Sequence, residues 1–126
     1  MANPLKIGIV EDETIFAEAL QSDLRDSGFI VSHVSSSTSD AIANIAKELP
    51  DLLILDVQLL GDDTGVQIAQ YVRRNNLNLP LIFLTGNAEA EYYSEIKAVN
   101  PSAVLRKPLN TGKIVNCING IFLGMA

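Results

Sequence analysis

Short apolar segments recur along the chain, separated by longer stretches of mixed polar and apolar character. The segments are LKIGIV (5–10), FIVSHV (29–34), DLLILDV (51–57), PLIFLT (80–85) and SAVLR (102–106). Several are nearly continuous aliphatic runs, which are typical of strands buried on both faces of a parallel sheet. The pattern therefore predicts five β-strands.

Apolar residues recur at helical spacing in the stretches between these segments. Examples are Phe16, Leu20 and Leu24 after the first segment, and Ile114, Ile118, Ile121 and Phe122 after the last. Helix signals agree with this interpretation: Thr64 can cap the third helix, Asn110 or Thr111 can cap the fifth, and Gly28 stands where the first should stop. The alternation predicts an α/β fold, with five helices around a doubly wound five-stranded parallel sheet in the order 2-1-3-4-5.

Length and charge narrow the classes of protein that fit. A chain of 126 residues is one domain by size, which we expect to span residues 1–126. The net charge of -6 is the wrong sign for a basic nucleic-acid surface, so we expect no direct binding of nucleic acid. Neither a signal peptide nor a run long enough to span a membrane is recognisable, and the single Cys117 cannot form an internal disulfide. We therefore expect a soluble chain in the cytoplasm, without membrane contact.

Polar residues stand at the carboxyl ends of the predicted strands, where a doubly wound sheet binds its ligands. Glu11 and Asp12 follow the first strand, and Asp56 ends the third. Three carboxylates in one crevice repel one another unless a cation lies among them, and oxygen ligands that leave room for waters suit Mg²⁺. Thr85 and Lys107, at the ends of the fourth and fifth strands, add a hydroxyl and an ammonium suited to a bound anion. The pattern predicts a site for Mg²⁺ and a phosphoryl group.

Four motifs at these strand ends carry a resemblance to a known family. They are VEDE (10–13), LILDVQL (53–59), FLTGN (83–87) and RKPL (106–109). Together they resemble the receiver domain of two-component response regulators, bacterial signalling proteins that include chemotaxis regulators. The resemblance covers essentially the whole chain, and it implies a flavodoxin-like fold.

The resemblance implies a role for each residue of the site. Asp56 is the phosphoacceptor, which takes its phosphoryl group from a histidine of a sensor histidine kinase. For Mg²⁺, Asp12 is a direct ligand, Glu11 acts through water, Asp56 contributes its carboxylate and Gln58 its backbone carbonyl. Thr85 is the switch hydroxyl.

Lys107 is expected to pair with a phosphoryl oxygen, and its bond to Pro108 is expected to be cis. The domain would catalyse only its own phosphorylation and slow dephosphorylation, so it is not expected to be an enzyme in the ordinary sense. Gln58 and Asn87 would border the path of the hydrolytic water, and neither side chain can act as a strong base.

Two other functions stay open for the same residues. One is a phosphorelay receiver that passes its phosphoryl group to a histidine phosphotransfer protein. The other is a metal-dependent phosphohydrolase, for which the sequence lacks an additional acid near Asp56 to activate water.

Position 104 departs from the receiver pattern, and the last helix has an apolar arc that needs an explanation. Receivers often carry an aromatic residue three positions before the lysine, where this chain has Val104. The apolar arc of the last helix is either buried packing or part of a homodimer surface formed by helix 4, strand 5 and helix 5.

His33 is expected to be a partly exposed strand side chain, Cys117 a packing residue, and at least one of the adjacent Tyr92 and Tyr93 exposed.

Overall fold

The structure is a computed structural model that describes residues 4–86 and 90–123. Strands and helices alternate along the chain. The strands are β1 (Lys6–Val10), β2 (Ile30–Ser35), β3 (Leu52–Asp56), β4 (Leu81–Thr85) and β5 (Ala103–Arg106). The helices are α1 (Thr14–Asp26), α2 (Thr38–Lys47), α3 (Gly65–Arg74), α4 (Tyr93–Ala98) and α5 (Thr111–Leu123).

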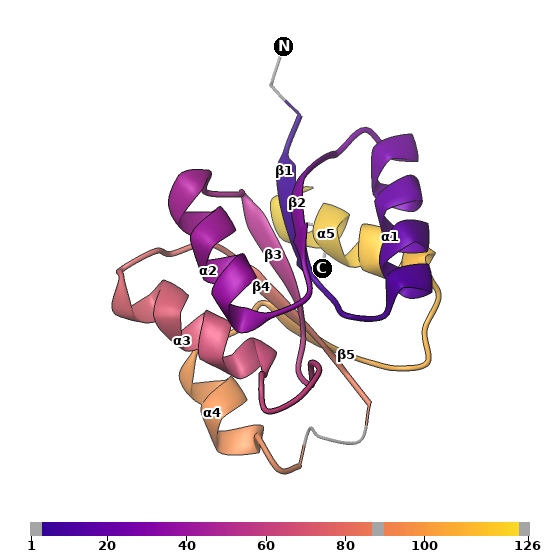
Figure 1. The fold of residues 1–126 in the computed structure, drawn as a ribbon. Coiled ribbons are helices and arrows are strands. Elements are labelled where there is room, and N and C mark those ends of the chain that lie inside the picture. Colours follow the sequence, from indigo (N-terminus) through magenta and orange to yellow (C-terminus); the bar gives the residue numbers. More distant parts are fainter. Residues whose placement is uncertain (1–3, 87–89, 124–126) are drawn as a thin grey trace.

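The five strands form one parallel sheet in the order β2-β1-β3-β4-β5, as the sequence predicts. Helices α1 and α5 lie on one face of the sheet, and α2, α3 and α4 lie on the other (Figure 1). The strand order reverses between β1 and β3, so their carboxyl ends open a crevice between the two helical layers. This crevice is the place for a ligand in such a sheet.

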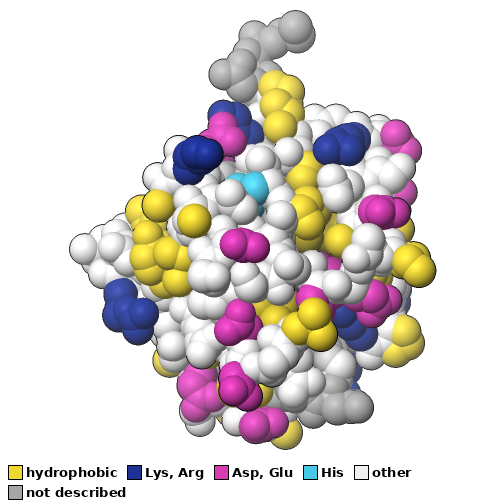
Figure 2. Space-filling view, in the orientation of Figure 1, with side chains coloured by type: hydrophobic (Ala, Val, Ile, Leu, Met, Phe, Trp, Pro, Cys, Tyr) yellow, Lys and Arg dark blue, Asp and Glu magenta, His cyan; other side chains and the backbone are white. Residues whose placement is uncertain are grey.

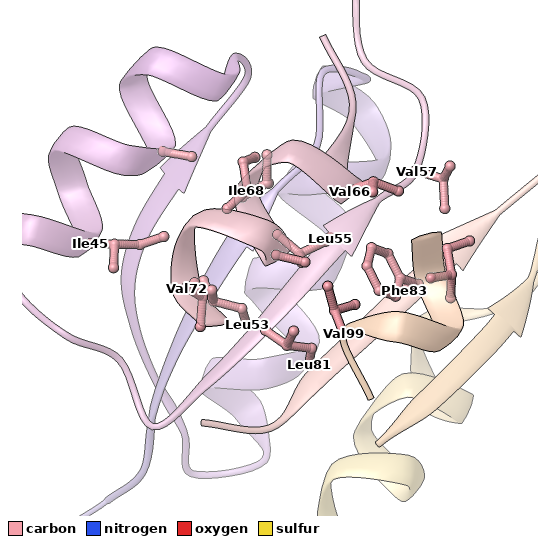
Figure 3. Packing of buried hydrophobic residues seen from close by; sticks show 14 of the residues in the cluster. Ile45, Leu53, Leu55, Val57, Val66, Ile68, Val72, Leu81, Phe83 and Val99 are labelled. Atoms are coloured by element: carbon pink, nitrogen blue, oxygen red, sulfur yellow. The ribbon is translucent and has the colours of Figure 1, made fainter. Parts of the chain in front are cut away.

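Each face of the sheet has its own apolar core. Every residue of β3 and β4 is buried, because both strands are covered by helices on both faces. Figure 3 shows the core beneath α2, α3 and α4, where Leu53, Leu55 and Phe83 meet side chains of the helices. The opposite core packs side chains of α1 and α5, including Leu20 and Ile114, against the other face. Burial on both sides makes the strand ends rigid supports for the residues that follow them.

The predicted helix signals are confirmed. Thr64 caps α3 with a full capping box, since its hydroxyl accepts from the Gln67 N–H and the Gln67 side chain accepts from the Thr64 N–H. Asn110 is the cap of α5, because its Oδ1 accepts from the Lys113 N–H at 3.0 Å. Gly28 follows α1 with a φ of 92°, a conformation in which a side chain would be strained.

Four side chains outside the site lie as the sequence predicts. His33 is half-buried on β2, and neither ring nitrogen has a hydrogen-bond partner among the described residues. Cys117 packs against the core beneath α1 and α5. Tyr93 is 59% exposed, whereas Tyr92 packs against the core on the α4 side.

In the part of the chain that the structure describes, no helix combines the length and the apolar character that crossing a membrane requires.

Candidate functional site

The parallel register brings the ends of four strands to one edge of the sheet. Asp56, the last residue of β3, pairs with Leu84 of β4, and Thr85 follows as the last residue of β4. The Lys107 N–H donates to the Thr85 carbonyl at 2.8 Å, which fixes the residue after β5 beside the end of β4. Glu11 stands directly after β1, next to β3 in the sheet.

The three carboxylates predicted to share a crevice do so. Glu11, Asp12 and Asp56 each offer an oxygen, and these oxygens lie within 4.8 Å of one another. Glu11 and Asp56 are only 3% and 6% exposed, while Asp12 is half-buried. Acidic side chains also gather over the lower half of the surface in Figure 2, the end of the molecule at which the strands finish in Figure 1.

Lys107 joins two of these carboxylates. Its ammonium donates to Glu11 Oε1 and to Asp56 Oδ2, each at 2.9 Å. The Lys107–Pro108 bond is cis, as the resemblance implies. Burial by itself lowers the pKa of Lys107, but the hydrogen bonds to Asp56 and Glu11 outweigh it and raise that pKa above the usual value. The ammonium is therefore charged at neutral pH.

Ionisation of Glu11 is disfavoured by its surroundings. Burial raises the pKa of its carboxyl to about 7, and the neighbouring Asp56 adds to this, although the hydrogen bond from Lys107 pulls the pKa down. With all three carboxyls ionised, one ammonium would leave two negative charges uncompensated. A divalent cation that takes oxygen ligands would neutralise them, so the donor set fits Mg²⁺.

Thr85 has a buried hydroxyl without a partner. The residue has no exposed surface, and its Oγ1 makes no hydrogen bond among the described residues. Buried hydroxyls nearly always have a partner, so an unpaired one at a ligand-binding edge fits a group that is bound there. An oxygen-rich anion on Asp56 would supply that partner.

The loop between β3 and α3 is held tightly against Asp56. The Gln58 N–H donates to Asp56 Oδ1 at 3.3 Å, and the Gly65 N–H donates to the Val57 carbonyl at 2.9 Å. A Cβ at Gly65 would lie 2.2 Å from the Asp56 carbonyl oxygen, so only glycine allows this approach. The Gln58 side chain is exposed and lines a cavity of about 250 Å³ together with Thr64. Asn87 lies outside the described residues.

The position usually taken by an aromatic residue is small in this chain. Val104 is half-buried on β5 and lines a cavity of about 320 Å³ between β5 and α4. The rest of the lining comes from Tyr93, Ile96, Lys97, Asn100 and Pro101. No bulky ring from β5 fills this space, as the sequence indicates.

One contact of the site was not anticipated from the sequence. The Lys107 ammonium lies over the ring of Phe16, 5.1 Å from its centroid. The helical periodicity of α1 identifies Phe16 only as a packing residue, and no local signal connects it to a lysine beyond β5. The contact exists because Lys107 reaches across the carboxyl edge of the sheet to Glu11, which lies shortly before α1 in the chain.

The doubly wound sheet thus carries at its carboxyl edge an acidic crevice, a paired lysine and a buried hydroxyl that has no partner among the described residues. Residues 7–119 match the model of the response regulator receiver domain. The chain therefore belongs to the response regulator receiver domain family, whose members are signalling switches of two-component systems.

The chain is similar to bacterial regulators over most of its length. It is 30% identical over 113 residues to the transcriptional regulatory protein DltR of Streptococcus agalactiae, which covers 88% of this chain and 49% of the relative. It is 36% identical over 112 residues to the regulatory protein VanRc of Enterococcus gallinarum, covering 87% and 46%. The chain thus spans about half the length of these relatives.

Among solved structures, the chain is similar to a CheY-like response regulator receiver domain protein from Methanospirillum hungatei. The TM-score is 0.86 with 21% identity, over 96% of this chain and 95% of that one. At this identity the similarity supports the fold alone, which is the flavodoxin-like receiver fold.

Proposed function

We propose that Asp56 accepts a phosphoryl group from a phosphohistidine of a sensor histidine kinase, and that residues 1–126 form the receiver unit this modification controls. The observation that carries the proposal is the Lys107 ammonium, which lies 2.9 Å from Asp56 and 2.9 Å from Glu11 at the end of a fully buried strand. A solvated surface acid has neither a half-buried cation paired with it nor a rigid support. Asp56 has both.

The transfer needs no additional base. The nucleophile is a carboxylate oxygen of Asp56, which attacks the phosphorus directly. The new O–P bond forms as the N–P bond to the kinase histidine breaks, and the imidazole leaves with the electron pair of that bond. Positioning and charge neutralisation supply most of the rate in such reactions.

Glu11, Asp12, the Asp56 carboxylate and the Gln58 backbone carbonyl are the groups that would hold Mg²⁺. The ion, when bound, neutralises phosphoryl oxygens and so lowers the repulsion between the donor and the acidic crevice. Asp12→Ala is expected to weaken Mg²⁺ binding strongly, measured by metal titration, because it removes the carboxylate least engaged with Lys107. Equal affinity in variant and parent would show that the crevice is only a hydrated acidic surface.

Lys107 and Thr85 would bind the transferred group. The Lys107 ammonium already contacts Asp56, so it can pair with a phosphoryl oxygen without a large displacement. The buried Thr85 hydroxyl would donate to another oxygen of the same group, which satisfies its unused hydrogen-bonding capacity. This new bond would give the phosphorylated state a different arrangement at the end of β4.

The test uses a small phosphoryl donor and intact mass. With acetyl phosphate and Mg²⁺, the parent should gain the mass of one phosphoryl group and Asp56→Asn should not. Asp62→Asn is the matched control, because Asp62 is an exposed acid on the adjoining loop. Undiminished phosphorylation of Asp56→Asn would refute the assignment.

The output surface proposed for the switch is formed by α4, β5 and α5, through which two copies would pair. It presents exposed apolar side chains, with Tyr93 at 59% exposure on α4 and Leu123 at 66% on α5. Sedimentation of the parent with and without beryllium fluoride, a phosphoryl analogue, tests the pairing. A monomer in both states at high concentration would exclude it.

A further inference from the structure

The Lys107 ammonium has a third neighbour besides Glu11 and Asp56. It lies 5.1 Å from the centroid of the Phe16 ring, within the range in which a cation is attracted to an aromatic face. Phe16 is half-buried in the first turn of α1 and packs against the core on that side of the sheet. Its ring is therefore held in place independently of Lys107.

The ammonium has space into which it could turn away from the acids. Phe16 and Lys107 both line a cavity of about 440 Å³, together with Glu13, Pro108 and Leu109. Glu13 is an exposed carboxylate, and its charge would attract the ammonium toward the outside of the site. The aromatic face lies 5.1 Å from the ammonium and attracts the cation where it stands, so it opposes this displacement.

We propose that Phe16 is a positioning residue, whose ring holds the Lys107 ammonium where it can pair with a phosphoryl group on Asp56. The inference rests on the proposed function, because the benefit is realised only when an anion binds at Asp56. Phe16→Leu would keep the apolar packing of α1 but remove the aromatic face. Phe16→Tyr would keep both the packing and the aromatic face.

The contact itself is measurable without phosphorylation. Protons over the face of an aromatic ring resonate upfield, so the ε-methylene protons of Lys107 should be shifted upfield in the parent protein. The shift should vanish in Phe16→Leu and persist in Phe16→Tyr. The spectrum of Lys107→Met identifies the resonance.

The consequence is measured as affinity for beryllium fluoride in the presence of Mg²⁺, using the ¹⁹F signal of the bound species. We expect Phe16→Leu to bind it about fivefold more weakly, the scale of one modest cation–π interaction. Phe16→Tyr should bind it as the parent does. Ile15→Ala is the matched control, because Ile15 is the neighbouring apolar residue and is 82% exposed.

The outcomes separate the inference from the function on which it rests. No upfield shift in the parent would overturn the contact, and equal affinity in Phe16→Leu and the parent would overturn its role while leaving the proposed function intact. Weaker binding in Phe16→Tyr to the same degree as in Phe16→Leu would assign the effect to packing and also overturn the inference. If the parent itself failed to bind beryllium fluoride while the upfield shift persisted, the proposed function would fall and this inference with it.

Discussion

Replacing Gly65 by alanine should damage both the stability and the site, because the start of α3 lies against the backbone of Asp56. An added Cβ would stand 2.2 Å from the Asp56 carbonyl oxygen and 3.1 Å from its carbonyl carbon. Ordinary contact begins at 3.4 Å, so the helix or the strand end must move by about 1 Å. The obstacle is backbone on a buried strand, which cannot turn aside as a side chain can.

The expected cost is at the upper end of the range for an overpacked core, about 3 kcal/mol. Moving α3 away lengthens the 2.9 Å bond from the Gly65 N–H to the Val57 carbonyl, and moving the strand end displaces the carboxylate that Lys107 holds. A displacement of this size at a reacting group can lower a rate by up to about a hundredfold. Phosphorylation by acetyl phosphate should therefore slow markedly even where the variant is folded.

Urea unfolding followed by far-ultraviolet circular dichroism measures the stability, since the chain has no tryptophan. In thermal unfolding followed by the same signal, the melting temperature of Gly65→Ala should lie about 10 °C below that of the parent. Gly86→Ala is the matched control, because among the described residues a Cβ there meets nothing within 4 Å and the backbone is not in the left-handed region. Gly65→Ala within about 0.5 kcal/mol of the parent would refute the close-approach argument.

Three further predictions concern stability. Thr64→Ala should lower the free energy of unfolding by about 1 kcal/mol in urea, because α3 loses its capping box. Arg73→Met should lower it by about 2 kcal/mol, because the guanidinium donates to the carbonyls of Val99, Leu77, Leu79 and Asn100 and so ties α4 to the end of α3. Burial lowers the pKa of His33, so its contribution to stability should be lost as pH falls from above 6.5, when the unfolded chain takes up a proton that the folded chain resists. Unfolding of the parent and His33→Leu over pH 5 to 8 measures this contribution.

Each of these three predictions has a control variant or a result that would contradict it. Thr14→Ala is the control for Thr64→Ala, because it removes an exposed threonine at the start of α1. If both substitutions lowered the free energy of unfolding equally, the loss in Thr64→Ala could not be assigned to the cap of α3. Arg74→Met removes the adjacent exposed arginine, and should leave the stability within about 0.5 kcal/mol of the parent. For His33, the measured quantity is the difference in the free energy of unfolding between the parent and His33→Leu at each pH. Taking this difference removes the contribution of Glu11, because its raised pKa gives both proteins a pH dependence of the opposite sign. A difference that is constant with pH would contradict the prediction.

The strands, the helices and their order could be predicted because local pattern determined them. The aliphatic run before Asp56 is long enough for one strand and has no polar face, so only a doubly covered sheet accommodates it. Thr64 and Gly28 mark helix ends through hydrogen bonds and backbone angles within a few residues of themselves. The crevice acids followed from the rule that parallel strands end at one edge.

The finer geometry of the site could not be predicted in this way. The cap of α5 was open between Asn110 and Thr111 until the backbone showed which residue precedes the helix. The sequence contains Glu11 and Lys107, but not the 2.9 Å bond that joins them or the burial that raises the pKa of Glu11 to about 7. Those quantities depend on how completely the helices exclude water from the crevice.

The sequence by itself determined the class of fold, the residues at the strand ends and the family to which they belong, because each of these rests on periodicity and short motifs. Tertiary structure alone decided that Phe16 lies under Lys107 and that Gly65 touches the backbone of Asp56. The separation of two such residues along the chain does not indicate whether they meet in the fold. The packing of helices on a twisted sheet sets the distance between them.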